Sequence, residues 1–151
     1  MKTNPVVHFE MGYNNKNRMV DFYTKVFGWK AKMMGQDMGN YVVVTTTESD
    51  QKTGRPKKPG SINGGFYQKI ESPLSHAPSV VIAVDDIKKS MKEVVAAGGK
   101  ILGAMDKSGK PSMEPMEIPG VGLWISIMDT ENNRVSLLQP NAQMIAAKKK
   151  K

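Results

Sequence analysis

The sequence repeats one order of elements after an interval of about 70 residues. Residues 6–11 form an apolar run that is followed by a polar break, an amphipathic stretch and Gly28. Residues 79–84 form a second apolar run, followed by two aspartates, another amphipathic stretch and paired glycines at 98–99. Each copy therefore predicts a strand, a helix start, a helix and a helix stop. Because neither copy can bury its apolar face alone, we expect the two modules to pack together.

Local patterns predict the elements of each module. Strands are expected at residues 5–11, 29–34, 40–47, 61–68, 79–84, 100–103, 113–117, 122–128 and 133–139. Each module has one helix, capped by Asn14 or Asn15 in the first and by Asp85 or Asp86 in the second. The buried stripes of the helices are predicted to be Met19, Phe22, Tyr23 and Val26, and Ile87, Met91, Val94 and Val95.

The positive charge of the chain is concentrated in two segments. The formal net charge is +8, of which Lys148–Lys151 contribute four charges and residues 50–60 contribute three. The rest is nearly neutral, which is unlike the basic face of a nucleic-acid binder. We therefore expect no specific nucleic-acid partner, an exposed polar loop at 48–59, and a basic C-terminal tail at 141–151.

Further composition features bound the class of protein. The chain has no cysteine, so disulfides, thiolate catalysis and thiolate metal sites are excluded, and a reducing cytoplasm is compatible. The first residues lack the apolar core of a signal peptide, and no apolar run approaches the roughly 20 residues of a membrane span. We predict a cytoplasmic protein without a membrane partner.

With these modules laid out, the chain resembles the vicinal oxygen chelate superfamily, which contains glyoxalase I, bleomycin-resistance proteins and extradiol dioxygenases. The resemblance rests on an ordered set of short motifs: His8-Phe9-Glu10, residues 21–30, Val84-Asp85-Asp86-Ile87, residues 96–100, and residues 118–122 leading to 129–133. It implies an α+β fold in which two paired βαβββ modules, about 5–70 and 79–140, form an eight-stranded cup with helices outside. It also implies a single glyoxalase-like domain over residues 5–140, and a homodimer.

The resemblance further implies a divalent metal held by four ligands, but only one ligand position carries a suitable side chain. His8 stands at the first position, whereas Ser79 and Ser136 stand where a stronger ligand is expected. The remaining position falls at residues 64–66, Gly-Gly-Phe, which cannot coordinate through a side chain. Since bound metals require their full ligand count, we predict no metal and no other cofactor.

Other site chemistries were weighed against this prediction. A cluster of His8, Glu10 and His76 could hold an unusual metal, although a lone strand histidine is more often a hydrogen-bonded interior residue. Neither Ser79 nor Ser136 lies in a nucleophile elbow, so serine catalysis is not indicated.

We therefore expect a protein that binds a small organic ligand in the cup without a metal. His8 and Glu10, sharing one face of the first strand opposite Val7 and Phe9, are predicted as polar anchors. The predicted ligand-binding residues are His8, Glu10, Tyr41, Ser79, Trp124 and Ser136.

Two alternatives stay open: a lyase, isomerase or dioxygenase with an unusual metal or with His8 as general base, and an interaction module using the basic loop and tail. Catalytic residues are not assigned, and glyoxalase I activity is not expected. The residues identify neither the ligand nor whether the cup closes within one chain or across a dimer.

Overall fold

A computed structural model describes residues 3–141 of the chain. These residues fall into two compact units, one made of residues 7–79 and the other of residues 80–141 with the first residues up to Val6. Whether they act as one domain stays a prediction. The predicted basic tail lies outside the described residues except for Asn141. No helix of the described part is long and apolar enough to cross a membrane.

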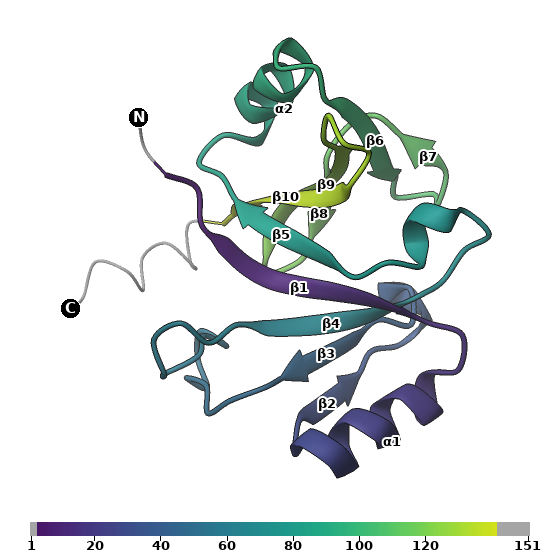
Figure 1. Cartoon of the computed structure of the whole chain (residues 1–151), viewed down its shortest axis with the longest axis vertical. Coiled ribbons are helices and arrows are strands. Elements are labelled where there is room, and N and C mark those ends of the chain that lie inside the picture. Colours follow the sequence, from purple (N-terminus) through teal and green to yellow (C-terminus); the bar gives the residue numbers. More distant parts are fainter. Residues whose placement is uncertain (1–2, 142–151) are drawn as a thin grey trace. The chain divides into compact units, whose positions relative to one another are not determined.

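The first unit is a four-stranded sheet with one long helix (Figure 1). Its elements are β1 (Val6–Tyr13), α1 (Lys16–Phe27), β2 (Lys30–Met33), η1 (Gln36–Met38), β3 (Val42–Thr45), β4 (Asn63–Gln68) and η2 (Pro73–Ser75). The strand order is β2-β3-β4-β1. The first two pairs are antiparallel, and β4 returns parallel to β1, with Glu10 opposite Gly65.

The second unit repeats this topology and adds two short strands. Its elements are β5 (Ser79–Ala83), α2 (Ile87–Ala96), β6 (Lys100–Met105), β7 (Pro111–Ser112), β8 (Met116–Ile118), β9 (Gly122–Met128) and β10 (Arg134–Pro140). The order β6-β9-β10-β5 matches β2-β3-β4-β1, and again the last strand pairs parallel to the first. The predicted α+β fold of two βαβββ modules is confirmed.

The resemblance implies eight strands and the local patterns predict nine, whereas ten are present in the described residues. The prediction of one continuous strand at 113–117 is wrong. It is replaced by β7, which pairs with β6, and by β8, which pairs with β9. Pro115 lies between them, and since proline has no N–H to donate, a continuous ladder cannot run through this position.

The helix ends follow the predicted capping chemistry. Asn15 caps α1 by accepting a hydrogen bond from the Arg18 amide at 2.9 Å, and Asp86 caps α2 through the Lys89 amide at 2.9 Å. Gly28 ends α1 at φ 67°, the left-handed conformation that glycine adopts without strain. Because each cap satisfies an amide group of the first helical turn, these contacts help to define where each helix begins.

Each helix covers one apolar face of its own sheet. In the first unit the fully buried core is Tyr13, Val42, Val44 and Phe66, and in the second it is Val84, Ile87, Ile125, Ile127 and Leu137. Two predicted stripes need correction. Phe22 and Val26 are more than half exposed while Val20 packs on the core, and Val95 is 56% exposed. The apolar stripes are narrower than the sequence suggested.

The α1 cap gives a direct test of the fold. Replacing Asn15 with Ala removes the acceptor for the Arg18 amide and should lower the free energy of unfolding by about 1 kcal/mol. In thermal unfolding this corresponds to a fall of roughly 3 °C. Asn14→Ala is the matched control, because the neighbouring asparagine is not the cap. Equal losses in both variants would contradict the assignment.

Candidate functional site

The alternation of β1 separates its polar side chains from its apolar ones. Phe9, Met11 and Tyr13 pack in the core of the first unit together with α1 residues. Since successive side chains of a strand point to opposite faces, His8 and Glu10 lie on the face away from α1. This packing agrees with the prediction that His8 and Glu10 share one face of the first strand. Val7 does not join the core, however, and is 38% exposed.

Tyr41 connects the polar face of β1 to the segment before β3. Its hydroxyl lies 3.0 Å from the Nε2 atom of His8, within hydrogen-bonding distance. Its phenol ring covers Gly65 of β4, so closely that a Cβ added at Gly65 would overlap the ring. The residue opposite Gly65 in the parallel pair is Glu10. His8, Glu10 and Tyr41, three of the six predicted site residues, are therefore gathered on one face of the first unit.

Burial determines the charge of His8. Desolvation lowers its pKa from 6.5 to about 4, because the charged imidazolium loses water that the neutral ring does not need. At neutral pH the ring is therefore uncharged, with one nitrogen that donates and one that accepts. A neutral imidazole beside a phenol hydroxyl can bind a polar group of a ligand through hydrogen bonds rather than through ionic attraction.

Glu10 brings a carboxyl group to the same face. Only 8% of its surface is exposed, which is uncommon for glutamate unless the group has a partner. It therefore belongs to the interior rather than to a solvated rim.

The other three predicted residues lie on strands β5, β9 and β10. Ser79 is the first residue of β5 and is 5% exposed, and Ser136 of β10 is fully buried. Trp124 of β9 is half-buried, two residues before Ser126, which pairs with Ser136. Ser136 and Trp124 thus share one face of the second sheet. Whether any of the six residues binds a ligand stays a prediction.

The described residues do not fit the divalent metal of the family. Among residues 3–141 no three His, Asp or Glu side chains are grouped as metal ligands would be. The alternative cluster of His8, Glu10 and His76 is therefore not formed, and the Nε2 atom of His76 lies 3.2 Å from the Ile70 carbonyl oxygen instead. At the glycine ligand position, the space beside Gly65 is filled by Tyr41.

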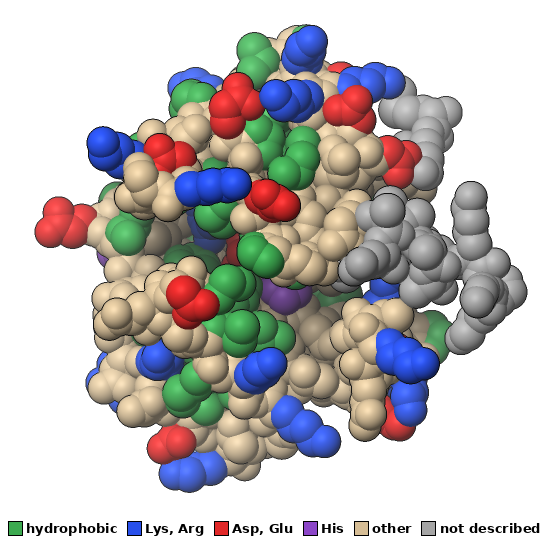
Figure 2. All heavy atoms as spheres, turned by 180° about the vertical axis from the view of Figure 1, so that it is seen from behind, with side chains coloured by type: hydrophobic (Ala, Val, Ile, Leu, Met, Phe, Trp, Pro, Cys, Tyr) green, Lys and Arg blue, Asp and Glu red, His purple; other side chains and the backbone are tan. Residues whose placement is uncertain are grey.

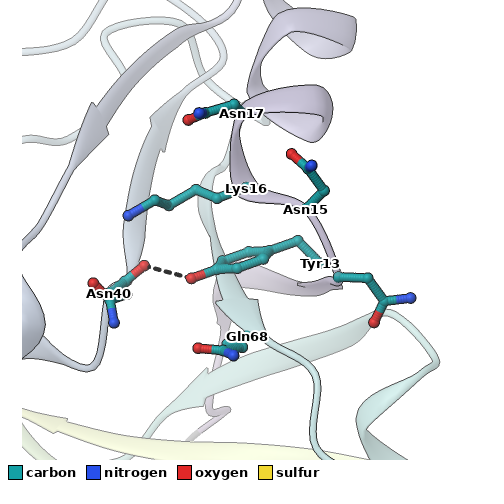
Figure 3. A pocket seen from close by; sticks show the side chains of 7 residues that line it. Tyr13, Asn15, Lys16, Asn17, Asn40 and Gln68 are labelled. Carbon is teal, nitrogen blue, oxygen red and sulfur yellow. Dashed lines mark hydrogen bonds between the residues drawn. The ribbon is translucent and has the colours of Figure 1, made fainter.

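A polar hollow near the start of α1 was not predicted. Its volume is about 350 Å³, and amide side chains dominate its lining. Figure 3 shows Tyr13 donating a hydrogen bond to the carbonyl oxygen of Asn40 at 2.8 Å, with Lys16 reaching over it. The lining residues are Tyr13, Asn14, Asn15, Lys16, Asn17, Asn40 and Gln68. The available signal was the group of asparagines at 14, 15 and 17, of which the sequence analysis uses only Asn14 and Asn15, as candidate helix caps. This hollow does not include His8, Glu10 or Tyr41.

The surface charges of the described part do not form a basic face in the view of Figure 2, where acidic and basic side chains are interspersed. The basic loop is partly neutralised by its own acids. Lys57 forms an ion pair with Glu48, and Asp50 accepts from the Thr53 amide at 2.8 Å. The interaction-module alternative gains no support from this geometry.

Comparison with known proteins places the fold in a family. The profile of the Glyoxalase/Bleomycin resistance protein/Dioxygenase superfamily matches residues 6–137, and the chain belongs to this superfamily. Among curated proteins, no sequence matches the chain.

Solved structures share the fold at low identity. A methylmalonyl-CoA epimerase in complex with methylmalonyl-CoA and NH4+ is 11% identical, with a TM-score of 0.61 and coverage of 93% of this chain and 97% of the other. The epimerase from Mycobacterium tuberculosis is 12% identical, with a TM-score of 0.58 and coverage of 93% and 91%. A superfamily member from Vibrio splendidus 12B01 is 17% identical, with a TM-score of 0.55 and coverage of 91% and 99%.

The lowered pKa of His8 predicts a pH dependence of stability. Between pH 6.5 and about 4 the unfolded chain binds a proton at this residue that the folded chain does not, so stability falls as the pH falls. The full loss is at most about 3.4 kcal/mol, and most of it has occurred by pH 4. Urea unfolding at several pH values measures it. His8→Gln should flatten the slope in this window, whereas His76→Gln, the control at the other histidine, should keep it. An unchanged slope in His8→Gln would rule out a buried neutral His8.

Proposed function

We propose that this protein binds a small organic ligand on the polar face of its first unit, with His8 and Tyr41 as hydrogen-bonding anchors and without a divalent metal. The observation that carries the proposal is the contact between the Tyr41 hydroxyl and His8 Nε2 at 3.0 Å. His8 stands at the first metal-ligand position of the family, and in this contact it is paired with Tyr41 by a hydrogen bond. Ligand pockets commonly combine apolar walls with a few convergent polar groups of this kind.

The position of Tyr41 supports the absence of a metal in this proposal. A coordinating side chain at Gly65 would have to start where the phenol ring now lies. Tyr41 thus occupies the place that such a ligand would need, and its hydroxyl lies within hydrogen-bonding distance of His8 Nε2. A tetrahedral or octahedral ion needs several ligands around one point. Among the described residues, His8 and Glu10 are the only imidazole and carboxylate groups of β1.

The protonation state of His8 favours binding over proton abstraction. A general base works best when its pKa lies near the operating pH, and burial holds the pKa of His8 at about 4. An imidazole of such low basicity is a weak base near neutral pH. We therefore place the lyase, isomerase or dioxygenase alternative second.

The ligand class is proposed from chemistry and from the relatives. One structure with this fold holds methylmalonyl-CoA. We propose an acyl compound with oxygen acceptors, and methylmalonyl-CoA is the first probe to test. We further propose that the protein is cytoplasmic, because the cysteine-free sequence suits a reducing compartment. We propose a homodimer from the family resemblance alone. Light scattering after size-exclusion chromatography measures the oligomeric state, and a monomer would contradict the dimer.

A thermal-shift screen of acyl compounds tests the anchors. Tyr41→Phe keeps the ring over Gly65 but removes the hydroxyl, so it should weaken binding about tenfold while changing the fold little. His8→Gln and Glu10→Gln should also weaken binding. Gln68→Ala, in the separate hollow near α1, is the matched control and should bind normally. If the control loses binding and the other variants keep it, the ligand occupies the hollow instead.

Elemental analysis tests the metal-free part of the proposal. Protein purified without chelators should carry less than a tenth of an equivalent of zinc, nickel, iron or manganese, as expected for an incomplete ligand set. It should also lack glyoxalase activity on the hemithioacetal of methylglyoxal and glutathione. One tightly held ion per chain that is lost in His8→Ala would show that a metal site exists.

A further inference from the structure

The polar hollow near the start of α1 is held together by hydrogen bonds of the first unit. Tyr13, the buried residue of its lining, ends β1, and its carbonyl oxygen accepts from the Lys69 amide at 2.9 Å. The Tyr13 hydroxyl donates to the Asn40 carbonyl oxygen at 2.8 Å. The Asn40 amide in turn donates to the Gly35 carbonyl oxygen at 3.0 Å. The shape of the hollow therefore rests on bonds that the protein makes with itself.

Amide side chains without protein partners line this hollow. Within residues 3–141, four of them make no hydrogen bond to another residue: Asn14, Asn17, Asn40 and Gln68. Figure 3 shows the side chains of Lys16, Asn17 and Gln68 extending toward the side on which Asn40 lies. Water reaches these amides, because most of them are exposed, and a ligand can replace that water if it offers similar hydrogen bonds.

The chemistry of the amides selects hydroxyl groups. Each amide side chain carries two donor hydrogens and an acceptor oxygen, and each hydroxyl group likewise both donates and accepts. Apart from Tyr13, the lining consists only of asparagine, glutamine and lysine, so it offers little to an apolar ligand. The volume of about 350 Å³ lies near the lower end of the roughly 300–1,000 Å³ of ligand pockets. A small compound with several hydroxyl groups therefore suits it.

Lys16 gives the hollow one positive charge. The residue is half-buried and forms no ion pair within residues 3–141, whereas Lys25 of the same helix lies 3.7 Å from Asp21. No acidic residue lines the hollow. Because a charge that is partly removed from water interacts more strongly with an opposite charge, a carboxylate beside Lys16 would be favoured.

We propose that this hollow binds a small carboxylic acid that carries several hydroxyl groups, the chemistry of a sugar acid. Lys16 pairs with the carboxylate, and the four amide side chains exchange hydrogen bonds with the hydroxyl groups. The site is separate from the one around His8, with which it shares no lining residue, so it does not depend on the proposed function.

Three probes with the same carbon chain separate the two parts of this recognition. Gluconate has the carboxylate and the hydroxyl groups, glucitol lacks the carboxylate, and hexanoate lacks the hydroxyl groups. Each is titrated at millimolar concentration near neutral pH, and the side-chain amide signals of asparagine and glutamine are followed by nuclear magnetic resonance. We expect gluconate to shift the signals of Asn14, Asn17, Asn40 and Gln68 and to bind about tenfold more tightly than either other probe.

A lysine variant tests the charge. Lys16→Gln should weaken gluconate binding about tenfold and leave glucitol binding unchanged, because only the contact with the carboxylate is lost. Lys32→Gln is the matched control, since it removes the same charge from an exposed position on β2 that does not line the hollow. It should bind gluconate normally.

Two amide variants test the hydroxyl contacts. Asn40→Gly removes the side chain but accepts the φ of 54° that Asn40 adopts, and Asn17→Ala shortens an exposed residue of α1. Both should keep the melting temperature within a few degrees and weaken gluconate and glucitol alike. Gln51→Ala, in the loop at 48–59 and outside the hollow, is the control amide and should bind as the unaltered protein does.

The outcomes that overturn the proposal are distinct. Equal affinity for gluconate and glucitol would show that the charge is not recognised, and equal affinity for gluconate and hexanoate would show that the hydroxyl groups are not. Gluconate binding that persists in both Lys16→Gln and Asn40→Gly would place the ligand elsewhere. If gluconate does not bind at millimolar concentration, the hollow is not a site for this class of ligand.

Discussion

Parallel pairing of the last strand with the first is the constraint on which each unit depends. In the first unit β4 runs alongside β1, and in the second β10 runs alongside β5. Parallel neighbours need a long connection between them, and here the helix and two intervening strands provide it. The pairing fixes register, and register decides which side chains share a face. The opposition of Glu10 and Gly65, and of Ser136 and Val81, follows directly from it.

The polar face of the first unit is stable because its groups satisfy one another without net charge at His8. Burying an imidazolium would be unfavourable, and the lowered pKa shows that the ring stays neutral instead. A neutral ring still needs hydrogen-bond partners, and the Tyr41 hydroxyl supplies one. Tyr41 itself needs space for its ring, which Gly65 provides by having no side chain. The hydrogen bond of His8 and the packing of the Tyr41 ring therefore depend on the same three residues.

Much of the fold followed from local sequence signals, while the arrangement of the site did not. Caps and stops were predictable because each is a short-range hydrogen bond or dihedral preference. Asn132, for example, takes φ 65° in the last turn, as an asparagine tolerates. The interruption of the strand predicted at 113–117, of which only residues 116 and 117 belong to a strand, could have been foreseen from Pro115. The contact of Tyr41 with His8 could not, because the two residues are 33 positions apart and Tyr41 follows a segment, residues 34–40, that has no periodicity.

The same limit applies to the second unit. Ser136 and Trp124 were predicted to be ligand-binding residues, but Ser126, which lies opposite Ser136, was not singled out. Only the antiparallel register of β9 and β10 brings Ser126 into that row. A serine within an otherwise apolar strand was the available signal, and it was too common to interpret alone.

At Gly64 and Gly65 the sheet is bare backbone held between two aromatic rings, Phe9 on the helix side and Tyr41 on the other. This arrangement restricts which substitutions residue 65 can accept. A chelating side chain at residue 65 would have to displace the Tyr41 ring, and moving the ring would take its hydroxyl away from His8. A metal ligand at residue 65 and the hydrogen bond between Tyr41 and His8 therefore compete for the same space.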